Sequence, residues 1–251
     1  MAQYNICFSP TGGTKKVADY LAAALGGEFH FLDLCAPVEA RTLTSEDVCL
    51  VSIPSYGGRV PGLALDRLGM IQGNGAKAIA VCVYGNREWD DTLTELQDSL
   101  ISLGYTFAGA VAAVAEHSMF RQFAAGRPDE ADAAELAVFA GKIREKLDAG
   151  TFGPIELAGS HGPYKPFPGA SLKPVVSDAC TKCGICAESC PASAIDPQAP
   201  NTTNLVSCIG CMRCIALCPE KARVLDPQVV ETVGARLAPM LGGHKENYLF
   251  L

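Results

Sequence analysis

The sequence contains the run Cys180-x2-Cys183-x2-Cys186-x3-Cys190-Pro191, and it repeats this run 28 residues later as Cys208-x2-Cys211-x2-Cys214-x3-Cys218-Pro219. Eight of the 12 cysteines of the chain lie in these two runs. The thiolate form of cysteine binds metals, and its soft sulfur suits iron–sulfur clusters. The doubled spacing therefore predicts two [4Fe–4S] clusters.

The two runs resemble bacterial two-cluster ferredoxins, in which the cysteine before the proline binds the other cluster. The resemblance implies crossed sets of ligands. The first cluster is assigned Cys180, Cys183, Cys186 and Cys218, and the second is assigned Cys208, Cys211, Cys214 and Cys190. Zinc sites also use pairs of cysteines, but they take four ligands from two such pairs rather than triplets that are each followed by Cys-Pro. A disulfide framework needs an oxidising compartment, which nothing at the N-terminus indicates.

The composition is that of an acidic, core-forming chain. The 251 residues are 49% hydrophobic and 19% charged, and the formal net charge is −7. This length has room for one large or two smaller domains. The negative charge argues against nucleic acid as a partner and favours redox partner proteins with basic docking surfaces. Residues 1–4 lack the basic region of a signal peptide, and no apolar run approaches the ~20 residues of a membrane helix. We therefore expect a cytoplasmic protein without a membrane span.

Residues 1–150 alternate between strand patterns and helix patterns. Strands are expected at 3–8, 28–34, 48–53, 76–83 and 105–114. Helices are expected at 13–25, from about Leu63 to Ile71, from Leu93 to Leu103 with Gly104 closing the helix, and over a last segment up to about residue 148. This alternation predicts an α/β fold, a doubly wound parallel sheet with helices on both faces. In such sheets a ligand binds beyond the carboxyl ends of the strands, at the switch point.

Three loops follow the first, third and fourth strands, which surround that point in the order 2-1-3-4-5. The first loop contains Ser9, Pro10, Thr11, Gly12, Gly13 and Thr14. Its hydroxyls and glycines, followed by a helix N-terminus, suit a phosphate, although an ordinary turn with capping Ser and Thr explains the same residues. The second loop contains Pro54, Ser55, Tyr56, Gly57 and Gly58, and the third contains Tyr84, Gly85, Asn86, Arg87 and Trp89.

Residues 1–150 resemble the flavodoxin family, because Ser9-x-Thr11-Gly12-x-Thr14 is similar to its phosphate loop in a form one residue shorter than in the long-known flavodoxins. The resemblance implies an FMN whose phosphate lies on the first loop and whose ring lies between the other two. Tyr56, Tyr84 and Trp89 are the aromatic candidates beside the ring, but Tyr56 and Trp89 are equally well explained as ordinary loop residues. Arg87 either reaches a flavin oxygen or forms a surface ion pair.

Two further groups in this region are assigned no chemistry. Glu116 and His117, after the fifth strand, either border the flavin or form a plain loop end, and the second interpretation is favoured. The remaining cysteines are expected to be small buried core residues; they are Cys7, Cys35, Cys49 and Cys82.

The rest of the chain divides into three parts. Residues 151–173 form a Gly/Pro linker that proline stiffens. Residues 174–226 form a small α+β ferredoxin-like domain, too short for a strong core and therefore stabilised by its clusters. Its apolar residues are expected to pack around the clusters; they are Ile185, Ile195, Val206, Ile209, Leu217 and Val224. Residues 227–251 begin with a helix that ends near Pro239, and they finish with an apolar tail that we expect to pack on the first domain, with a partner contact as the alternative.

The whole chain resembles the flavodoxin–ferredoxin fusion proteins of anaerobes, known as EFR-type ferredoxins. The resemblance implies an electron-transfer protein that relays electrons between two [4Fe–4S] clusters and FMN and so links one-electron and two-electron partners. Two alternatives stay open: a flavin-dependent reductase of a small acceptor such as a quinone or a flavin, and a ferredoxin with an FMN-free docking domain. A homodimer is compatible with all three. No catalytic acid–base or nucleophile pattern stands out, and no GxGxxG follows a strand, so we expect no nicotinamide domain.

Overall fold

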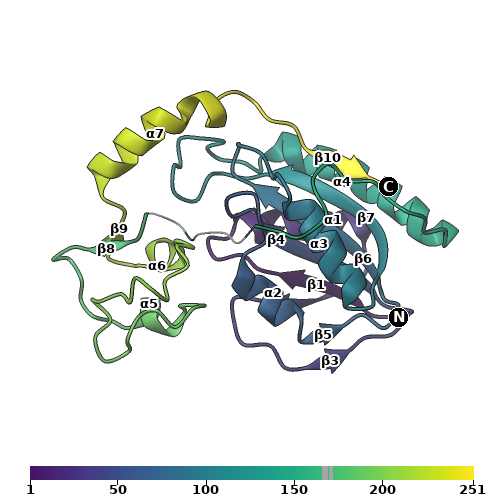
Figure 1. The fold of residues 1–251 in the computed structure, drawn as a ribbon, viewed down its shortest axis with the longest axis horizontal. Helices are drawn as coiled ribbons and strands as arrows, with labels where there is room; N and C mark the ends of the chain where they lie inside the picture. The colour runs from purple at the N-terminus through teal and green to yellow at the C-terminus, as the bar shows by residue number, and fades with distance from the viewer. Residues whose placement is uncertain (166–168, 170–171) are drawn as a thin grey trace.

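The computed structural model describes residues 1–165, 169 and 172–251, and a six-stranded sheet forms the centre of its larger part (Figure 1). Five strands are parallel in the spatial order β2 (Phe29–Asp33), β1 (Gln3–Cys7), β4 (Val48–Pro54), β6 (Lys77–Tyr84) and β7 (Thr106–Val114). The sixth strand, β10 (Tyr248–Phe250), pairs antiparallel with β7 at the edge. Numbered along the chain, the parallel strands have the order 2-1-3-4-5, which confirms the flavodoxin-like fold class.

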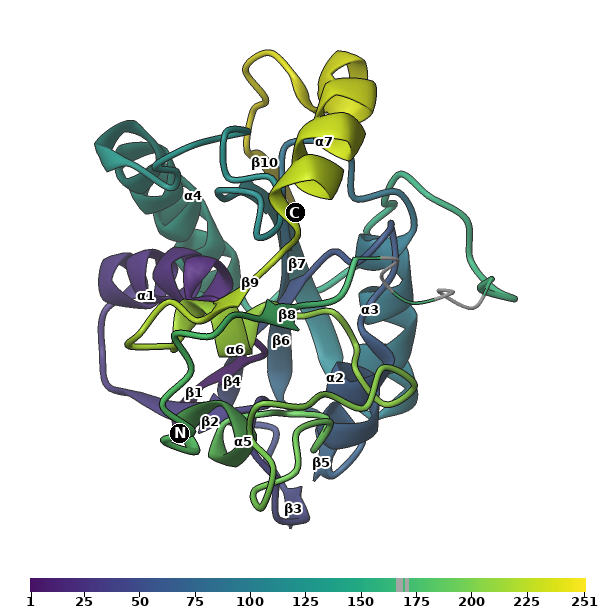
Figure 2. The same cartoon turned by 90° about the vertical axis from the view of Figure 1, so that its left-hand side faces the viewer.

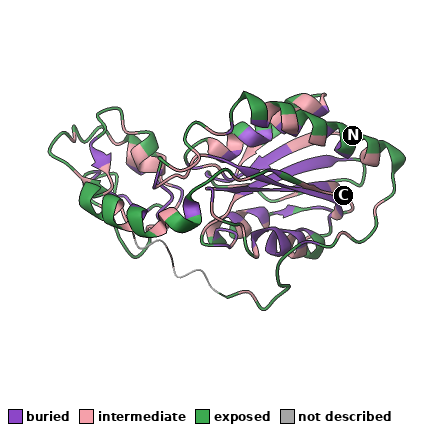
Figure 3. Ribbon diagram, turned by 90° about the horizontal axis from the view of Figure 1, so that it is seen from above, coloured by how far each residue is buried: buried purple, intermediate pink, exposed green. Residues whose placement is uncertain are grey.

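Helices cover both faces of this sheet, and the inner strands β4, β6 and β7 are buried, whereas the edge strand β2 has no buried residue (Figure 3). Helices α1 (Gly13–Leu25) and α4 (Glu130–Ala149) pack on one face, with Ile79 and Val81 of β6 beneath them. Helices α2 (Gly62–Leu68) and α3 (Thr92–Ser102) pack on the other, over Ala80 and Cys82. Alternate residues of β6 thus enter two cores, which is why its sequence is almost wholly apolar.

The four cysteines outside the repeated runs are buried in this domain, as expected. Burial raises the pKa of the Cys35 thiol and of the Cys49 thiol to about 12. These thiols therefore stay protonated and unreactive at neutral pH.

The prediction that the second helix extends to Ile71 is wrong. Helix α2 ends at Leu68, and Ile71 lies in β5 (Ile71–Gln72), which pairs with β3 (Arg41–Thr42) in a two-stranded parallel sheet. Ile71 is fully buried in the strand, as it would be on the apolar face of a helix. A short apolar run therefore does not distinguish a helix from a strand. Leu103 and Gly104 do close α3 as expected, because Gly104 has a φ of 80° and donates its N–H to Ile101 O at 3.0 Å.

The ferredoxin-like part contains two short helices and a two-stranded antiparallel sheet. The helices are α5 (Ile185–Glu188) and α6 (Arg213–Ala216), and the strands are β8 (Val175–Val176) and β9 (Arg223–Val224). Both helices begin after a left-handed residue, Gly184 and Met212, as the sequence repeat requires. The expectation is wrong for Val206, which is 96% exposed in a turn in which Asn204 Oδ1 accepts the Val206 N–H. It is also wrong for Leu217, which is 41% exposed.

The chain then returns to the first domain through α7 (Pro227–Leu241), which spans the distance between the two parts (Figure 1). This helix includes Pro239 and ends two residues later than expected, at Leu241. The following tail forms β10, in which Phe250 pairs with Ala110. The expectation that the tail packs on the first domain is therefore confirmed.

The linker before the ferredoxin-like part lies along α3 where the structure describes it. Gln97 donates to Ile155 O at 2.9 Å, Ser160 N–H donates to Asp91 Oδ1 at 2.9 Å, and Leu157 is buried. Pro166 and Pro168, which contributed to the linker prediction, lie outside the described residues. Among the described residues, no helix combines the length and the apolar character needed to cross a membrane.

Candidate functional site

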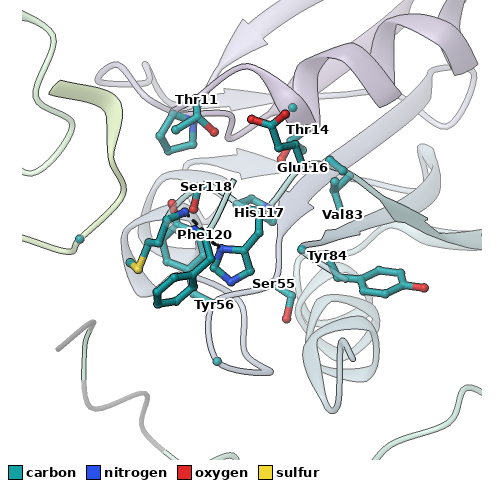
Figure 4. Close-up of a pocket in the computed structure, with 18 of the residues that line it drawn as sticks. Thr11, Thr14, Ser55, Tyr56, Val83, Tyr84, Glu116, His117, Ser118 and Phe120 are labelled. Atoms are coloured by element: carbon teal, nitrogen blue, oxygen red, sulfur yellow. Dashed lines mark hydrogen bonds between the residues drawn. The ribbon is translucent and has the colours of Figure 1, made fainter. Parts of the chain in front are cut away.

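A cavity of about 310 Å³ lies at the carboxyl ends of β1, β4, β6 and β7, where the predicted switch point falls (Figure 4). Ten of the sequence-predicted residues line it: Pro10, Thr11, Gly13, Thr14, Pro54, Ser55, Tyr56, Gly57, Tyr84 and Gly85. The other six, Ser9, Gly12, Gly58, Asn86, Arg87 and Trp89, are not part of its wall. Their positions are explained loop by loop below.

The first loop presents the start of α1 to the cavity. Gly12 is the residue before the helix, with a φ of 95°, and as a glycine it offers no side-chain cap. Ser9 supports the loop from behind by accepting the Lys15 N–H at 2.9 Å. The Lys16 N–H donates to Gly12 O at 2.9 Å, so the N–H groups of Gly13 and Thr14 are the ones in the first helical turn that remain for an anion. A Cβ on Gly13 would lie 3.2 Å from the Cβ of Ala115, so a larger residue would crowd this cradle. These features fit a phosphate group.

The second loop is held rigid by a buried ion pair. Tyr56 and Arg59 exchange backbone hydrogen bonds of 2.9 and 3.2 Å. The Arg59 side chain donates to Glu95 of α3 at 2.8 Å, and Glu95 also accepts the Val60 N–H at 2.8 Å. Gly58 faces the third loop, where a Cβ would lie 2.7 Å from the Cβ of Asp90. These contacts fix the loop so that Ser55, Tyr56 and Gly57 line the cavity.

The third loop mainly holds the C-terminal segment. The Tyr84 hydroxyl donates to Glu246 O at 2.7 Å, and its ring points away from the cavity (Figure 4). Asn86 is buried and donates to Leu241 O at 2.5 Å and to Gly243 O at 2.9 Å. The Trp89 ring packs 5.1 Å from that of Tyr84 and 5.3 Å from that of Tyr248. Arg87 forms an exposed ion pair with Asp90. Nothing in the sequence of this loop indicated the segment that it binds.

A fourth loop, after β7, also lines the cavity, through Glu116, His117, Ser118, Met119 and Phe120. Sequence reasoning favoured a loop end without chemistry here. His117 Nδ1 accepts the N–H groups of Met119 and Phe120 at 3.1 and 3.2 Å, and burial lowers the pKa of His117 to about 4. Burial alone would raise the pKa of Glu116, but the Gly126 N–H and the Arg121 guanidinium bring it below its usual value.

The neutral form of His117 holds this loop, and this gives a first prediction. The unfolded chain takes up a proton below pH 6.5, the ordinary pKa of histidine, whereas folded His117 does not do so until about pH 4. The free energy of unfolding is therefore highest above pH 6.5 and decreases as the pH falls. The decrease that His117 causes reaches about 2 kcal/mol at pH 5. We expect thermal unfolding of the H117N variant to depend less on pH between 7 and 5 than that of the native chain.

The exposed His244 provides the matched control, because its side chain is 68% exposed. The H244N variant should keep the pH dependence of the native chain. Equal pH dependence in H117N and the native chain would contradict the assigned role of His117.

The cavity is roofed by the C-terminal half of the chain. Gly210 of the ferredoxin-like part lines it, as do Val233 and Leu237 of α7. Between them, Gly234 lies so close to the fourth loop that a Cβ there would be 2.9 Å from Gln122 Nε2 and 3.6 Å from the Phe120 ring. The walls thus combine a polar cradle at α1 with an apolar cover, which suits a ligand that has a phosphate and a flat ring.

Two smaller cavities lie inside the ferredoxin-like part, and four cysteines line each of them. We call cavity 1 the one lined by Cys180, Cys183, Cys186 and Cys218, and cavity 2 the one lined by Cys190, Cys208, Cys211 and Cys214. The Ala194 N–H lies 3.3 Å from Cys190 Sγ, and the Ala222 N–H lies 3.2 Å from Cys218 Sγ. All these cysteines are unpaired. Four soft donors with N–H groups on the sulfurs fit an iron–sulfur cluster in each cavity, although ligation by each cysteine stays a prediction.

The ferredoxin-like part lies against the carboxyl ends of the sheet strands (Figure 2). Ile209 packs against the core of the first domain, its neighbour Gly210 lines the large cavity, and Cys211 lines cavity 2. Arg67 of α2 donates to Pro191 O at 2.6 Å across the same boundary, and Arg213 reaches Pro10 O at 3.5 Å. Cavity 2 is therefore the one next to the large cavity.

Comparison with known proteins gives matches to two different parts of the chain. Residues 179–223 match the family model of a 4Fe–4S dicluster domain. No curated protein sequence gives a significant match. The first domain is similar to flavodoxin 2 from Bacillus cereus, at 17% identity over 58% of this chain and 99% of that one, with a TM-score of 0.42. A flavodoxin of Streptococcus pneumonia TIGR4 is similar at 19% identity over 60% of this chain and 100% of that one, with a TM-score of 0.40.

A third similar structure is rubredoxin oxygen:oxidoreductase from the anaerobe Desulfovibrio gigas, at 16% identity over 59% of this chain and 35% of that one, with a TM-score of 0.40. The fold assignment itself rests on the strand order given above. In architecture the chain joins a flavodoxin-like α/β fold to a segment that matches a 4Fe–4S dicluster domain, a combination that supports electron transfer in general.

Proposed function

We propose that the protein relays electrons between two [4Fe–4S] clusters and an FMN bound in the large cavity. The observation that carries the proposal is the adjacency of Gly210 and Cys211, of which the first lines the large cavity and the second lines cavity 2. Clusters exchange single electrons and a flavin exchanges one or two, so the pair would connect one-electron and two-electron partners. The protein supplies the close approach, because neighbouring residues of one loop face both sites.

The order of the sites along the relay follows from their exposure. Cys211 is buried, whereas Cys183 on the wall of cavity 1 is exposed. The cluster in cavity 1 would therefore exchange electrons with a protein partner at the surface. The cluster in cavity 2 would pass electrons between the cluster in cavity 1 and the flavin. The acidic chain favours a partner with a basic docking surface.

The cover over the large cavity supports a relay rather than a reductase of small acceptors. Val233 and Leu237 of α7 lie over the cavity, and Asn86 and Tyr84 hold the segment that follows this helix. A quinone or free flavin would need α7 to move before it could stack on the ring. All 12 cysteines are unpaired thiols, and a reducing compartment such as the cytoplasm suits this state and the clusters.

Anaerobic reconstitution followed by rapid reduction tests the relay. Protein purified without oxygen should contain about one flavin and about eight iron atoms per chain. Reduction of the clusters by a one-electron donor should be followed by bleaching of the flavin absorbance at a rate independent of protein concentration. A rate that rises with protein concentration would point to transfer between chains, as in a homodimer or on collision. Reduced clusters beside a flavin that stays oxidised would disprove the relay.

Two matched variants separate the roles of the clusters. Cys183→Ala should remove the cluster in cavity 1. The cluster in cavity 2 would remain and would still pass electrons to the flavin. Cys214→Ala should remove the cluster in cavity 2. The donor would still reduce the cluster in cavity 1, but the flavin would stay oxidised because the connection to it is missing. Equal flavin reduction rates in the two variants would contradict the proposed order.

A further inference from the structure

Arg223 is the most unusual side chain in the ferredoxin-like part, because it is a cation that is only 1% exposed. It is the largest of the fully buried side chains among the described residues. It lies on β9 and forms part of the wall of cavity 1, next to Ala222 and Cys218. Arginine does not lose its proton in proteins, so a full positive charge is buried there.

Every hydrogen-bond acceptor of this guanidinium within the described chain is uncharged. Nη2 donates to Pro200 O at 2.5 Å and to Thr202 O at 2.9 Å, and Nη1 donates to Thr203 Oγ1 at 2.8 Å. Nε is buried without an acceptor among the residues that the structure describes. No carboxylate in the described residues forms an ion pair with Arg223. Burying an uncompensated charge is strongly destabilising, so a negative counter-charge is required.

The contents of cavity 1 would supply that charge. Cysteines bind metal as thiolates, and an iron–sulfur cluster with four thiolate ligands is a net anion whose charge grows by one when it is reduced. Pro200, which accepts from Arg223 Nη2, also lies 3.5 Å from Cys186 Sγ. The guanidinium is therefore one carbonyl group away from a sulfur of cavity 1.

The internal repeat shows that the corresponding position of the other half carries no charge. Arg223 lies 28 residues after Ile195, the same offset that relates the two cysteine runs. Ile195 is 3% exposed and forms the corresponding part of the wall of cavity 2. Arg213 also lines cavity 2, but it is partly exposed and reaches across to Pro10. Among the described positions that the repeat relates, the fully buried cation lines cavity 1 and not cavity 2, although its acceptor Thr203 belongs to the wall of cavity 2.

We infer that Arg223 is the counter-charge of the cluster in cavity 1 and that it raises the reduction potential of this cluster relative to the cluster in cavity 2. A nearby positive charge stabilises the more negative, reduced form, and net charge and hydrogen bonds to sulfur set cluster potentials. Arg223 is a positioning residue, because it acts on the cluster without being a ligand. The inference depends on the clusters and is independent of the flavin.

The test is a redox titration of the anaerobic holoprotein, followed by the electron paramagnetic resonance signals of the reduced clusters. The R223Q variant removes the charge and keeps amide donors for the carbonyl groups, whereas R223K keeps the charge. We expect R223Q to disfavour reduction of one cluster at least tenfold, which is about 59 mV for a one-electron couple. R223K should change the reduction equilibrium of the same cluster less than threefold. In the C183A background, which keeps only the cluster of cavity 2, R223Q should have a much smaller effect.

The other outcomes also decide the question. Unchanged potentials in R223Q with full iron content would overturn the inference, as would equal shifts in R223Q and R223K. If R223Q binds only one cluster while R223K binds both, the counter-charge role is supported through assembly. If both variants lose both clusters, Arg223 is a packing residue and the inference is wrong.

Discussion

Alanine in place of Cys214 is expected to leave the protein with one cluster instead of two. Cys214 lines cavity 2 together with Cys190, Cys208 and Cys211, and a cubane with three remaining thiolates is easily lost. Iron should fall from about eight to about four atoms per chain. Because the ferredoxin-like part is small, its thermal unfolding should also occur at a lower temperature.

The control is Cys49→Ala, which removes a thiol that is fully buried in β4 of the first domain. It should leave the iron content unchanged and cost only the modest stability of a small core truncation. Iron content in C214A equal to that in C49A would show that Cys214 is not a ligand.

Removal of the Thr14 hydroxyl is expected to weaken FMN binding about 10- to 100-fold, because a hydrogen bond to a charged group contributes roughly 1.5–3 kcal/mol. Thr14 is 5% exposed, lies in the first turn of α1 and lines the cavity beside Thr11. The variant T14V keeps the shape of the side chain. Titration of the flavin-free protein with FMN, followed by the fluorescence of the flavin, measures the dissociation constant.

Thr42 offers the matched substitution. It lies exposed in β3, away from the cavity wall, so T42V should bind FMN as tightly as the native chain. Riboflavin, which lacks the phosphate, should bind T14V and the native chain equally. Loss of riboflavin binding in T14V would indicate a damaged cavity instead of a missing phosphate contact.

The inner strands of the main sheet could be predicted from the sequence because they are buried on two sides. The apolar run in β6 is short, is rich in Val and Ile and lies between two turn-forming segments, which favours a central strand between two cores. Ile71 was misassigned because its burial satisfies a helix stripe and a strand equally. The cysteine runs were informative for a different reason, since their spacing reflects the shape of the ligand rather than a local backbone preference.

The position of the site at the ends of the strands was predictable for all three loops, but the role of individual side chains was not. The first loop needs hydroxyls and glycines at fixed positions, and these can be recognised in the sequence. Asn86 and Trp89 instead contact residues more than 150 positions away, such as Leu241 and Tyr248. Such contacts depend on the return of α7, and no local pattern encodes them. The same return explains why Val233 and Leu237 were not expected at the cavity.

The antiparallel pairing of β10 with β7 has a consequence for biosynthesis. The edge of β7 cannot be closed until residues 248–250 have left the ribosome, long after the rest of its sheet. Until then an apolar strand with unsatisfied backbone groups is open to strand exchange and aggregation. The two cysteine runs precede β10 in the chain, so they leave the ribosome before this edge can be closed.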